Sequence, residues 1–128
     1  ALPILAADNG IDDHVVFTEG VPFAELPAHY TLGDVFAMPC RTRGAGLDVE
    51  GLGIVFLEAS ATGIPVVAEI DGETGFVVDG RNLTEITDTI SALLSDPDTA
   101  ARMGARGRQW IDEQWRWDTL AARMGRLL

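Results

Sequence analysis

Short apolar runs alternate with segments of helical periodicity along this 128-residue chain, and this alternation constrains its fold more than any other feature. The clearest run is Ile64–Ala68, which is apolar throughout, as is typical of a strand buried on both faces of a parallel sheet. Residues 14–17, 34–39 and 75–78 are also expected to be strands, since they are short and rich in β-branched and aromatic side chains. The alternation predicts an α/β fold with a Rossmann-like, doubly wound parallel sheet.

Start and stop signals mark the helices between these strands. Asn9-Gly10 predicts a left-handed helix end, and Asn82 with Glu85 three residues later predicts a capped helix start. A proline at position 27 indicates that the helix there is interrupted or restarted. The segments expected to be helical are 1–8, 24–30, 53–62, a stretch behind Asn82, a stretch opened by Asp96-Pro97, and 118–127.

Composition excludes several classes of function. Twenty acidic residues against nine basic ones give a formal net charge of −11, which argues against a nucleic-acid partner. A hydrophobic content of 47% predicts a folded core, yet no apolar run approaches the roughly 18 residues that a membrane-spanning helix needs. The single cysteine, Cys40, cannot form an internal disulfide and fits a reducing cytoplasm.

The most informative segment for function is the glycine-bearing turn that leads into the helix at 53–62. Gly51 and Gly53 allow the backbone to approach a ligand closely, and the first amides of the helix can bind a pyrophosphate. Glu50 and Glu58 flank this turn. Because carboxylates repel phosphates, we expect both to accept hydrogen bonds from hydroxyl groups. The pattern fits a ligand with phosphates between two sugars.

The spacing of these glutamates resembles the E-x7-E motif of retaining GT-B glycosyltransferases. The run from Asp34 to Val55 is similar to actinobacterial phosphatidylinositol-mannoside mannosyltransferases, as are Glu58-Ala59, 62–68 and 72–78. The resemblance covers nearly the whole chain. It implies that residues 1–128 are the nucleotide-sugar-binding C-terminal domain, the C-terminal half of a GT-B fold.

The resemblance also implies a role for each residue of the site. Glu50 would be the catalytic residue and contact hydroxyls of the transferred sugar, while Glu58 would hold the ribose hydroxyls. Val21 would lie near the nucleobase. Backbone amides would reach the sugar and the diphosphate from Gly51, Leu52, Gly53, Ile54 and Val55. The substrate would be GDP-mannose or another nucleotide sugar, with no metal and no other cofactor.

Arg41 and Arg43 are candidates for phosphate or acceptor contacts, although solvated loop arginines would look the same in the sequence. The fold is expected to be incomplete. The family's first strand and its basic, glycine-rich loop are absent, as is a Gly-Gly-x-x-Glu segment expected between Ala68 and Gly72. A lipid acceptor would be bound through the missing N-terminal domain, with peripheral contact at the inner face of the cell membrane in the complete protein.

Three other interpretations remain open or are disfavoured. A GT-B transferase with a UDP-sugar donor would share the same motif, since E-x7-E does not specify the base. A non-catalytic nucleotide-sugar-binding fragment would also fit, because the basic loops are missing. A dinucleotide-binding oxidoreductase is disfavoured, because no strand leads into a G-x-G-x-x-G turn with an acidic residue about 20 positions later.

Overall fold

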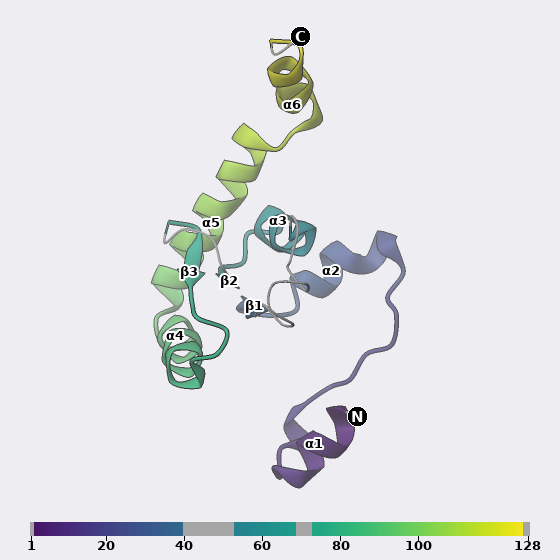
Figure 1. Ribbon diagram of the computed structural model, residues 1–128, viewed down its shortest axis with the longest axis vertical. Coiled ribbons are helices and arrows are strands. Elements are labelled where there is room, and N and C mark those ends of the chain that lie inside the picture. Colours follow the sequence, from purple (N-terminus) through teal and green to yellow (C-terminus); the bar gives the residue numbers. More distant parts are fainter. Residues whose placement is uncertain (1, 40–52, 69–72, 127–128) are drawn as a thin grey trace.

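A parallel sheet of three strands, in the order β1-β2-β3, forms the centre of the molecule (Figure 1). The computed structural model describes residues 2–39, 53–68 and 73–126. The strands are β1 (Phe36–Ala37), β2 (Val66–Ala68) and β3 (Gly75–Val77), and Val66 lies opposite both Phe36 and Gly75. The sheet confirms three of the predicted strands, although β1 is shorter than the predicted run 34–39.

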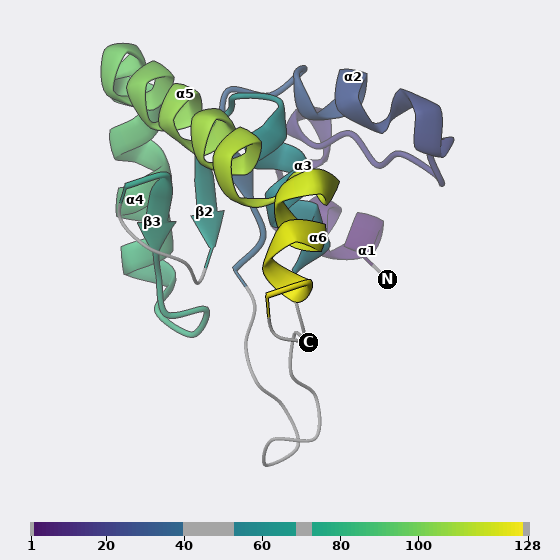
Figure 2. The same cartoon turned by 90° about the horizontal axis from the view of Figure 1, so that it is seen from above.

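Successive residues of β2 point to opposite faces of the sheet and belong to two separate cores. Val66 packs with Phe56 and Ala59 of α3 (Ile54–Ala61). Val67, which is fully buried, packs with Leu93 and Ala100 on the other side. Figure 2 shows α3 and α4 (Leu83–Ser95) on opposite sides of the strands. This arrangement confirms the doubly wound α/β fold.

Most of the helices follow their predicted signals. α1 (Leu2–Asp8) ends where Gly10 takes a φ of 66°, and the Asn82 side chain caps α4 by accepting from the Glu85 amide. Asp96 caps α5 (Pro97–Gln114) in the same way, through the Thr99 amide. The segment 24–30 is divided into a 3-10 turn, η2 (Phe23–Glu25), and α2 (Leu26–Tyr30).

The prediction of a strand at 14–17 is wrong. A 3-10 turn, η1, covers Asp12–His14, and residues 15–22, which connect it to η2, belong to no strand. A strand needs a neighbour to complete its backbone hydrogen bonds, and the apolar composition of 14–17 does not supply one. Figure 1 shows α1 well apart from the sheet, at the far end of an extended stretch that leads to η2 and α2. The side chains of Val16 and Phe17 are accordingly exposed.

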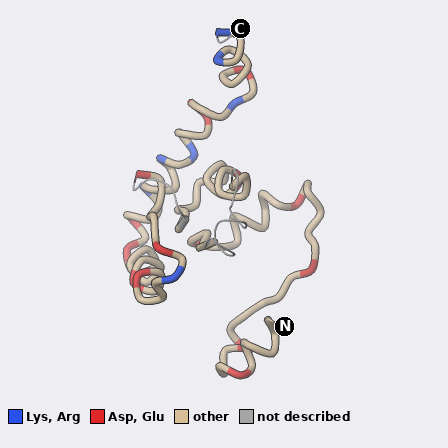
Figure 3. The backbone as a smooth tube through the Cα atoms, in the orientation of Figure 1, with Lys and Arg blue, Asp and Glu red and all other residues tan. Residues whose placement is uncertain are grey.

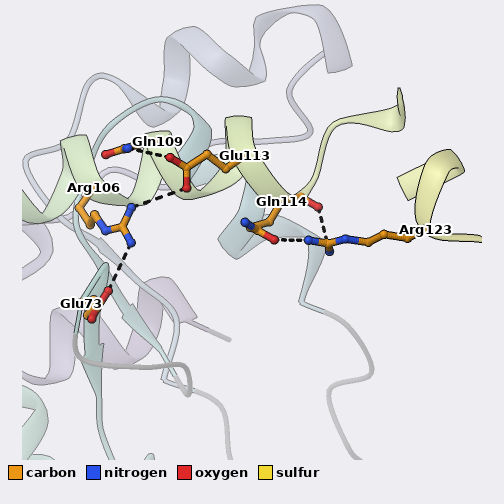
Figure 4. A network of polar contacts seen from close by, with 6 residues as sticks. All are labelled: Glu73, Arg106, Gln109, Glu113, Gln114 and Arg123. Carbon is orange, nitrogen blue, oxygen red and sulfur yellow. Dashed lines mark hydrogen bonds and ion pairs between the residues drawn. The ribbon is translucent and has the colours of Figure 1, made fainter. Parts of the chain in front are cut away.

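The C-terminal helix α6 (Trp117–Met124) lies beyond the end of α5, away from the sheet (Figure 1). It follows α5 closely, and Figure 4 shows Arg123 of α6 reaching back to the carbonyl and side-chain oxygens of Gln114. Trp110 and Trp115 pack edge to face beside this link, with ring centroids 5.7 Å apart. The predicted last helix, 118–127, begins one residue earlier than predicted and ends at Met124, three residues before the predicted end.

Candidate functional site

The start of α3 depends on a backbone conformation that favours glycine. Gly53 has φ 63° and ψ 48°, in the left-handed region, and its carbonyl accepts from the Phe56 amide at 2.9 Å. A Cβ at position 53 would overlap the Phe56 ring, with the Cε2 atom only 2.8 Å away. The first N–H groups of an α-helix have no partner within the helix, so the start of α3 favours an anion. Ile54 and Val55 supply two of these amides.

Glu58 lies one turn further along α3 and is held by a residue from another helix. The hydroxyl of Tyr30, the last residue of α2, donates to Oε2 of Glu58 over 2.8 Å. The bond is partly buried and joins residues 28 positions apart in the sequence. An ionised carboxylate only accepts hydrogen bonds, so the remaining oxygen of Glu58 can accept from the hydroxyl of a ligand.

Three aromatic rings tie Tyr30 to the same helix by a second route. The Tyr30 ring packs edge to face on Phe36 of β1, with centroids 5.6 Å apart, and Phe36 packs in the same manner on Phe56 of α3 at 6.0 Å. Such pairs stabilise a structure by ~0.5–1.5 kcal/mol beyond the area they bury. The ring of Tyr30 is therefore fixed before its hydroxyl meets Glu58.

A cavity of about 260 Å³ opens beside Glu58, between η2, α2 and the C-terminal part of α3. Its wall is mainly apolar and carries one carboxylate, a combination that suits a ligand with both hydroxyl groups and an apolar or aromatic face. The lining residues are Phe23, Leu26, Pro27, Tyr30, Glu58, Ala61 and Thr62.

The environment of Tyr30 shifts its ionisation. Burial, the hydrogen bond to Glu58 and the negative charge of Glu58, in that order, raise the pKa of Tyr30 from 10.0 to about 12. All three causes disfavour the phenolate, so the Tyr30 hydroxyl keeps its proton and can donate well above neutral pH.

A larger cavity, of about 410 Å³, lies at the amino ends of β1 and β2. Gly33 and Asp34 line it just before β1, and Ile64 and Pro65 just before β2. Ligands of open α/β sheets bind outside the carboxyl ends of the strands. This cavity is at the amino ends, so it is not the candidate site.

The structure places the predicted site residues that it describes as follows. Gly53, Ile54, Val55 and Glu58 lie together on the first turns of α3, as predicted. Val21 is half-buried in the stretch before η2 and does not line the cavity beside Glu58. The other predicted site residues lie outside the described residues: Glu50, Gly51, Leu52, Arg41 and Arg43.

Tyr30 is the residue of the site that sequence reasoning missed. No motif contains it, and its spacing from Glu58 has no regular period. The available signal is that the only tyrosine of the chain ends a short helix just before a strand.

Positive charge is distributed unevenly around the site. Figure 3 shows the described arginines from Arg81 onwards, most of them on α5 and α6. α2 and α3 carry neither Lys nor Arg. Among the described residues, a phosphate at the start of α3 would thus rely on backbone amides rather than on side chains of the two helices beside it.

Neither a membrane-spanning helix nor a metal-ligand cluster is found in the described ranges. None of the helices in 2–39, 53–68 and 73–126 is both long and apolar enough to cross a membrane. Within the same ranges, no three His, Cys, Asp or Glu side chains form a group that could hold a metal ion. The expectation that the donor binds without a metal stays a prediction.

Comparison with known protein families agrees with this geometry. Residues 3–110 match the family described as "Glycosyl transferases group 1". The chain belongs to this family. The resemblance stated from the sequence is thereby confirmed, and so is the α/β fold class that it implied.

Curated relatives are similar over almost the whole chain. A GDP-mannose-dependent alpha-(1-6)-phosphatidylinositol monomannoside mannosyltransferase of Mycobacterium tuberculosis is 59% identical, over 97% of this chain and 34% of its own length. The enzyme with the same name from Mycolicibacterium smegmatis is 56% identical, over 97% of this chain and 35% of its own length. A D-inositol 3-phosphate glycosyltransferase of Corynebacterium efficiens is 38% identical, over 78% of this chain and 24% of its own. The chain spans about a third of the length of the first two relatives.

Solved structures share the fold. A sucrose-phosphate synthase from Thermosynechococcus elongatus superposes with a TM-score of 0.85 at 27% identity, over 98% of this chain and 32% of its own. The C-terminal domain of a glycosyl transferase group 1 family protein from Francisella tularensis gives a TM-score of 0.77 at 21% identity, over 91% of this chain and 61% of its own. The second likeness is evidence of the fold alone.

Proposed function

We propose that this chain is the donor-binding C-terminal domain of a retaining glycosyltransferase, which transfers mannose from GDP-mannose to a phosphatidylinositol-type lipid. The observation that carries the proposal is the 59% identity, over 97% of the chain, to a relative named for GDP-mannose and phosphatidylinositol monomannoside. Identity at this level favours a common donor. The geometry of α3 supports a common site, because an amide-bearing helix start and a carboxylate lie on one element.

Each part of the donor has a counterpart in this site. The ribose hydroxyls donate to Glu58, and the diphosphate lies against the backbone amides at the start of α3, including those of Ile54 and Val55. Glu50 contacts the transferred sugar, and the amides of Gly51 and Leu52 extend the anion site. As the bond to the sugar breaks, negative charge grows on the leaving diphosphate, and oriented amides stabilise it without reorganising.

The remaining positive charge comes from outside α2 and α3. Arg41 and Arg43 precede the motif in the sequence and are our candidates for phosphate or acceptor contacts. We further propose that the lipid acceptor is bound by a domain other than these 128 residues, at the inner face of the cell membrane.

The test is a mannosyl-transfer assay with GDP-mannose and a phosphatidylinositol monomannoside acceptor, with any sequence that flanks residues 1–128 retained. Glu58→Ala should weaken donor binding by about 1–3 kcal/mol, the cost of losing hydrogen bonds to a charged group. Glu50→Ala should lower turnover more than it lowers ground-state binding.

Glu113→Ala is the matched control, because it removes an exposed helix glutamate from α5 rather than α3. Its activity should equal that of the original protein. Unchanged donor affinity in Glu58→Ala together with unchanged turnover in Glu50→Ala would refute the assignment of the site.

A further inference from the structure

The contact between Tyr30 and Glu58 goes beyond what the glutamate motif implies. A glutamate side chain in solution samples several rotamers, and fixing it on ligand binding costs up to ~2 kcal/mol of conformational free energy. In this structure Glu58 is already fixed, because the Tyr30 hydroxyl holds Oε2 at 2.8 Å. A carboxylate that is oriented before the ligand arrives binds it more tightly than a mobile one.

The support for Tyr30 comes from α3 itself. Phe56 and Glu58 are two residues apart on this helix, and both connect to Tyr30: Phe56 through the ring of Phe36, and Glu58 through the hydroxyl. Both contacts of Tyr30, through its ring and through its hydroxyl, therefore lead to the same helix, α3. Movement of Tyr30 away from Glu58 would therefore disturb the packing of Phe36, which belongs to the core on that face of the sheet.

We propose that Tyr30 is a positioning residue that orients the Glu58 carboxylate for the two ribose hydroxyls of the donor, and thereby sets selectivity for a ribonucleotide. The inference rests on the proposed function, since it takes the ribose to be the group that Glu58 binds. Tyr30 acts through Glu58. Its hydroxyl donates a hydrogen bond to one carboxylate oxygen, Oε2, and the other carboxylate oxygen faces the hydroxyls of the ligand.

The experiment compares two probes, GDP and 2′,3′-dideoxy-GDP, by isothermal titration calorimetry on the protein with any flanking sequence retained. The dideoxy probe lacks both hydroxyls that Glu58 would bind. The ratio of the affinity for GDP to the affinity for dideoxy-GDP therefore measures the contact between Glu58 and these hydroxyls. Tyr30→Phe removes the hydroxyl and keeps the ring that packs on Phe36. Thr87→Val is the control, because the exposed Thr87 hydroxyl donates to the Leu83 carbonyl of its own helix, α4, at 2.8 Å and does not line the cavity beside Glu58.

The expected result is a ratio that falls roughly three- to tenfold in Tyr30→Phe, the effect of losing one hydrogen bond. Dideoxy-GDP should bind this variant as it binds the original protein, which also shows that the site is folded. Glu58→Gln should reduce the ratio at least as much, and Thr87→Val should leave it unchanged.

Other outcomes separate the two claims. If Glu58→Gln lowers the ratio and Tyr30→Phe keeps it, the positioning role is wrong and the proposed function stands. Weaker binding of both probes to Tyr30→Phe would mean a structural role only and would also overturn the inference. If the original protein fails to bind GDP, or does not distinguish the probes, the proposed donor site itself is wrong.

Discussion

At the scale of single residues, the phenol of Tyr30 reports directly on the site, because its environment and its partner are both defined. Burial and Glu58 act together to raise the pKa of Tyr30 to about 12. Since the folded pKa lies above the ordinary value of 10.0, the stabilising contribution is fully present below pH 10.0. It should be lost as the pH rises from there towards 12.

Tyrosinate absorbance in the near ultraviolet measures this pKa without ambiguity, because Tyr30 is the only tyrosine of the chain. The titration midpoint should lie near 12, and Glu58→Gln should move it towards 10.0 by removing the negative charge next to the phenol. Burial is the largest cause and remains in the variant, so the return should be partial. A midpoint at the ordinary value in the original protein would mean that the contact with Glu58 does not form in solution.

The sequence predicts the site unevenly at this scale. Glu58, Gly53 and the start of α3 could be found because they belong to one motif on one element, where spacing along the chain fixes spacing in the structure. Tyr30 could not be found, because its contact depends on how α2 packs against α3, and no local pattern encodes that packing.

At the scale of secondary-structure elements, α5 lies so close to the turn after α3 that one of its positions has no room for a side chain. A Cβ at Gly104 would overlap the carbonyl oxygen of Gly63, with the carbonyl carbon 2.7 Å away. Position 107, one turn further along, is also buried, but a Cβ there would meet Ser60 and Thr74 at an ordinary 3.6 Å.

These two glycines form a matched pair. Gly104→Ala should lower the free energy of unfolding by about 1–3 kcal/mol, because α5 must move away from the turn. Gly107→Ala should be neutral, or stabilising by up to ~1 kcal/mol, since alanine favours a helix more than glycine does. Chemical denaturation of both variants checks this, and equal stability would show that the close approach of α5 is not as described.

Elements with their own start and stop signals were predictable, whereas those that depend on a partner were not. Asn82, Asp96 and Gly10 mark helix ends through local hydrogen bonds or a local φ, and each was identified from the sequence. The run at 14–17 has the composition of a strand, but it forms none in the described residues, because strand formation requires hydrogen bonds from a neighbour.

The short connection between β2 and β3 was also visible in the sequence. Only residues 69–74 join these parallel neighbours, whereas a parallel crossover typically takes a dozen or more residues. The expectation of a missing segment here remains a prediction. The match to the Mycobacterium tuberculosis relative runs over 133 positions, so that relative has residues within the matched region that this 128-residue chain lacks.

At the scale of the whole molecule, the candidate site and the larger cavity lie at different places around one sheet, and only one of them can be the donor site. Glu58 and the start of α3 form the first, while Gly33, Asp34 and Pro65 line the second at the amino ends of the strands. We propose that a guanine nucleotide binds at the first of these, beside Glu58 and the start of α3.

The most direct measurement is a two-dimensional amide NMR titration with GDP, and with UDP and ADP for comparison, repeated on Glu58→Ala. We expect shifts of the Ile54, Val55 and Glu58 amides that are larger with GDP than with UDP or ADP and are strongly reduced in the variant. Shifts that cluster around Gly33 and Ile64, which line the larger cavity, would contradict binding beside Glu58. Shifts that are the same in Glu58→Ala would contradict it as well.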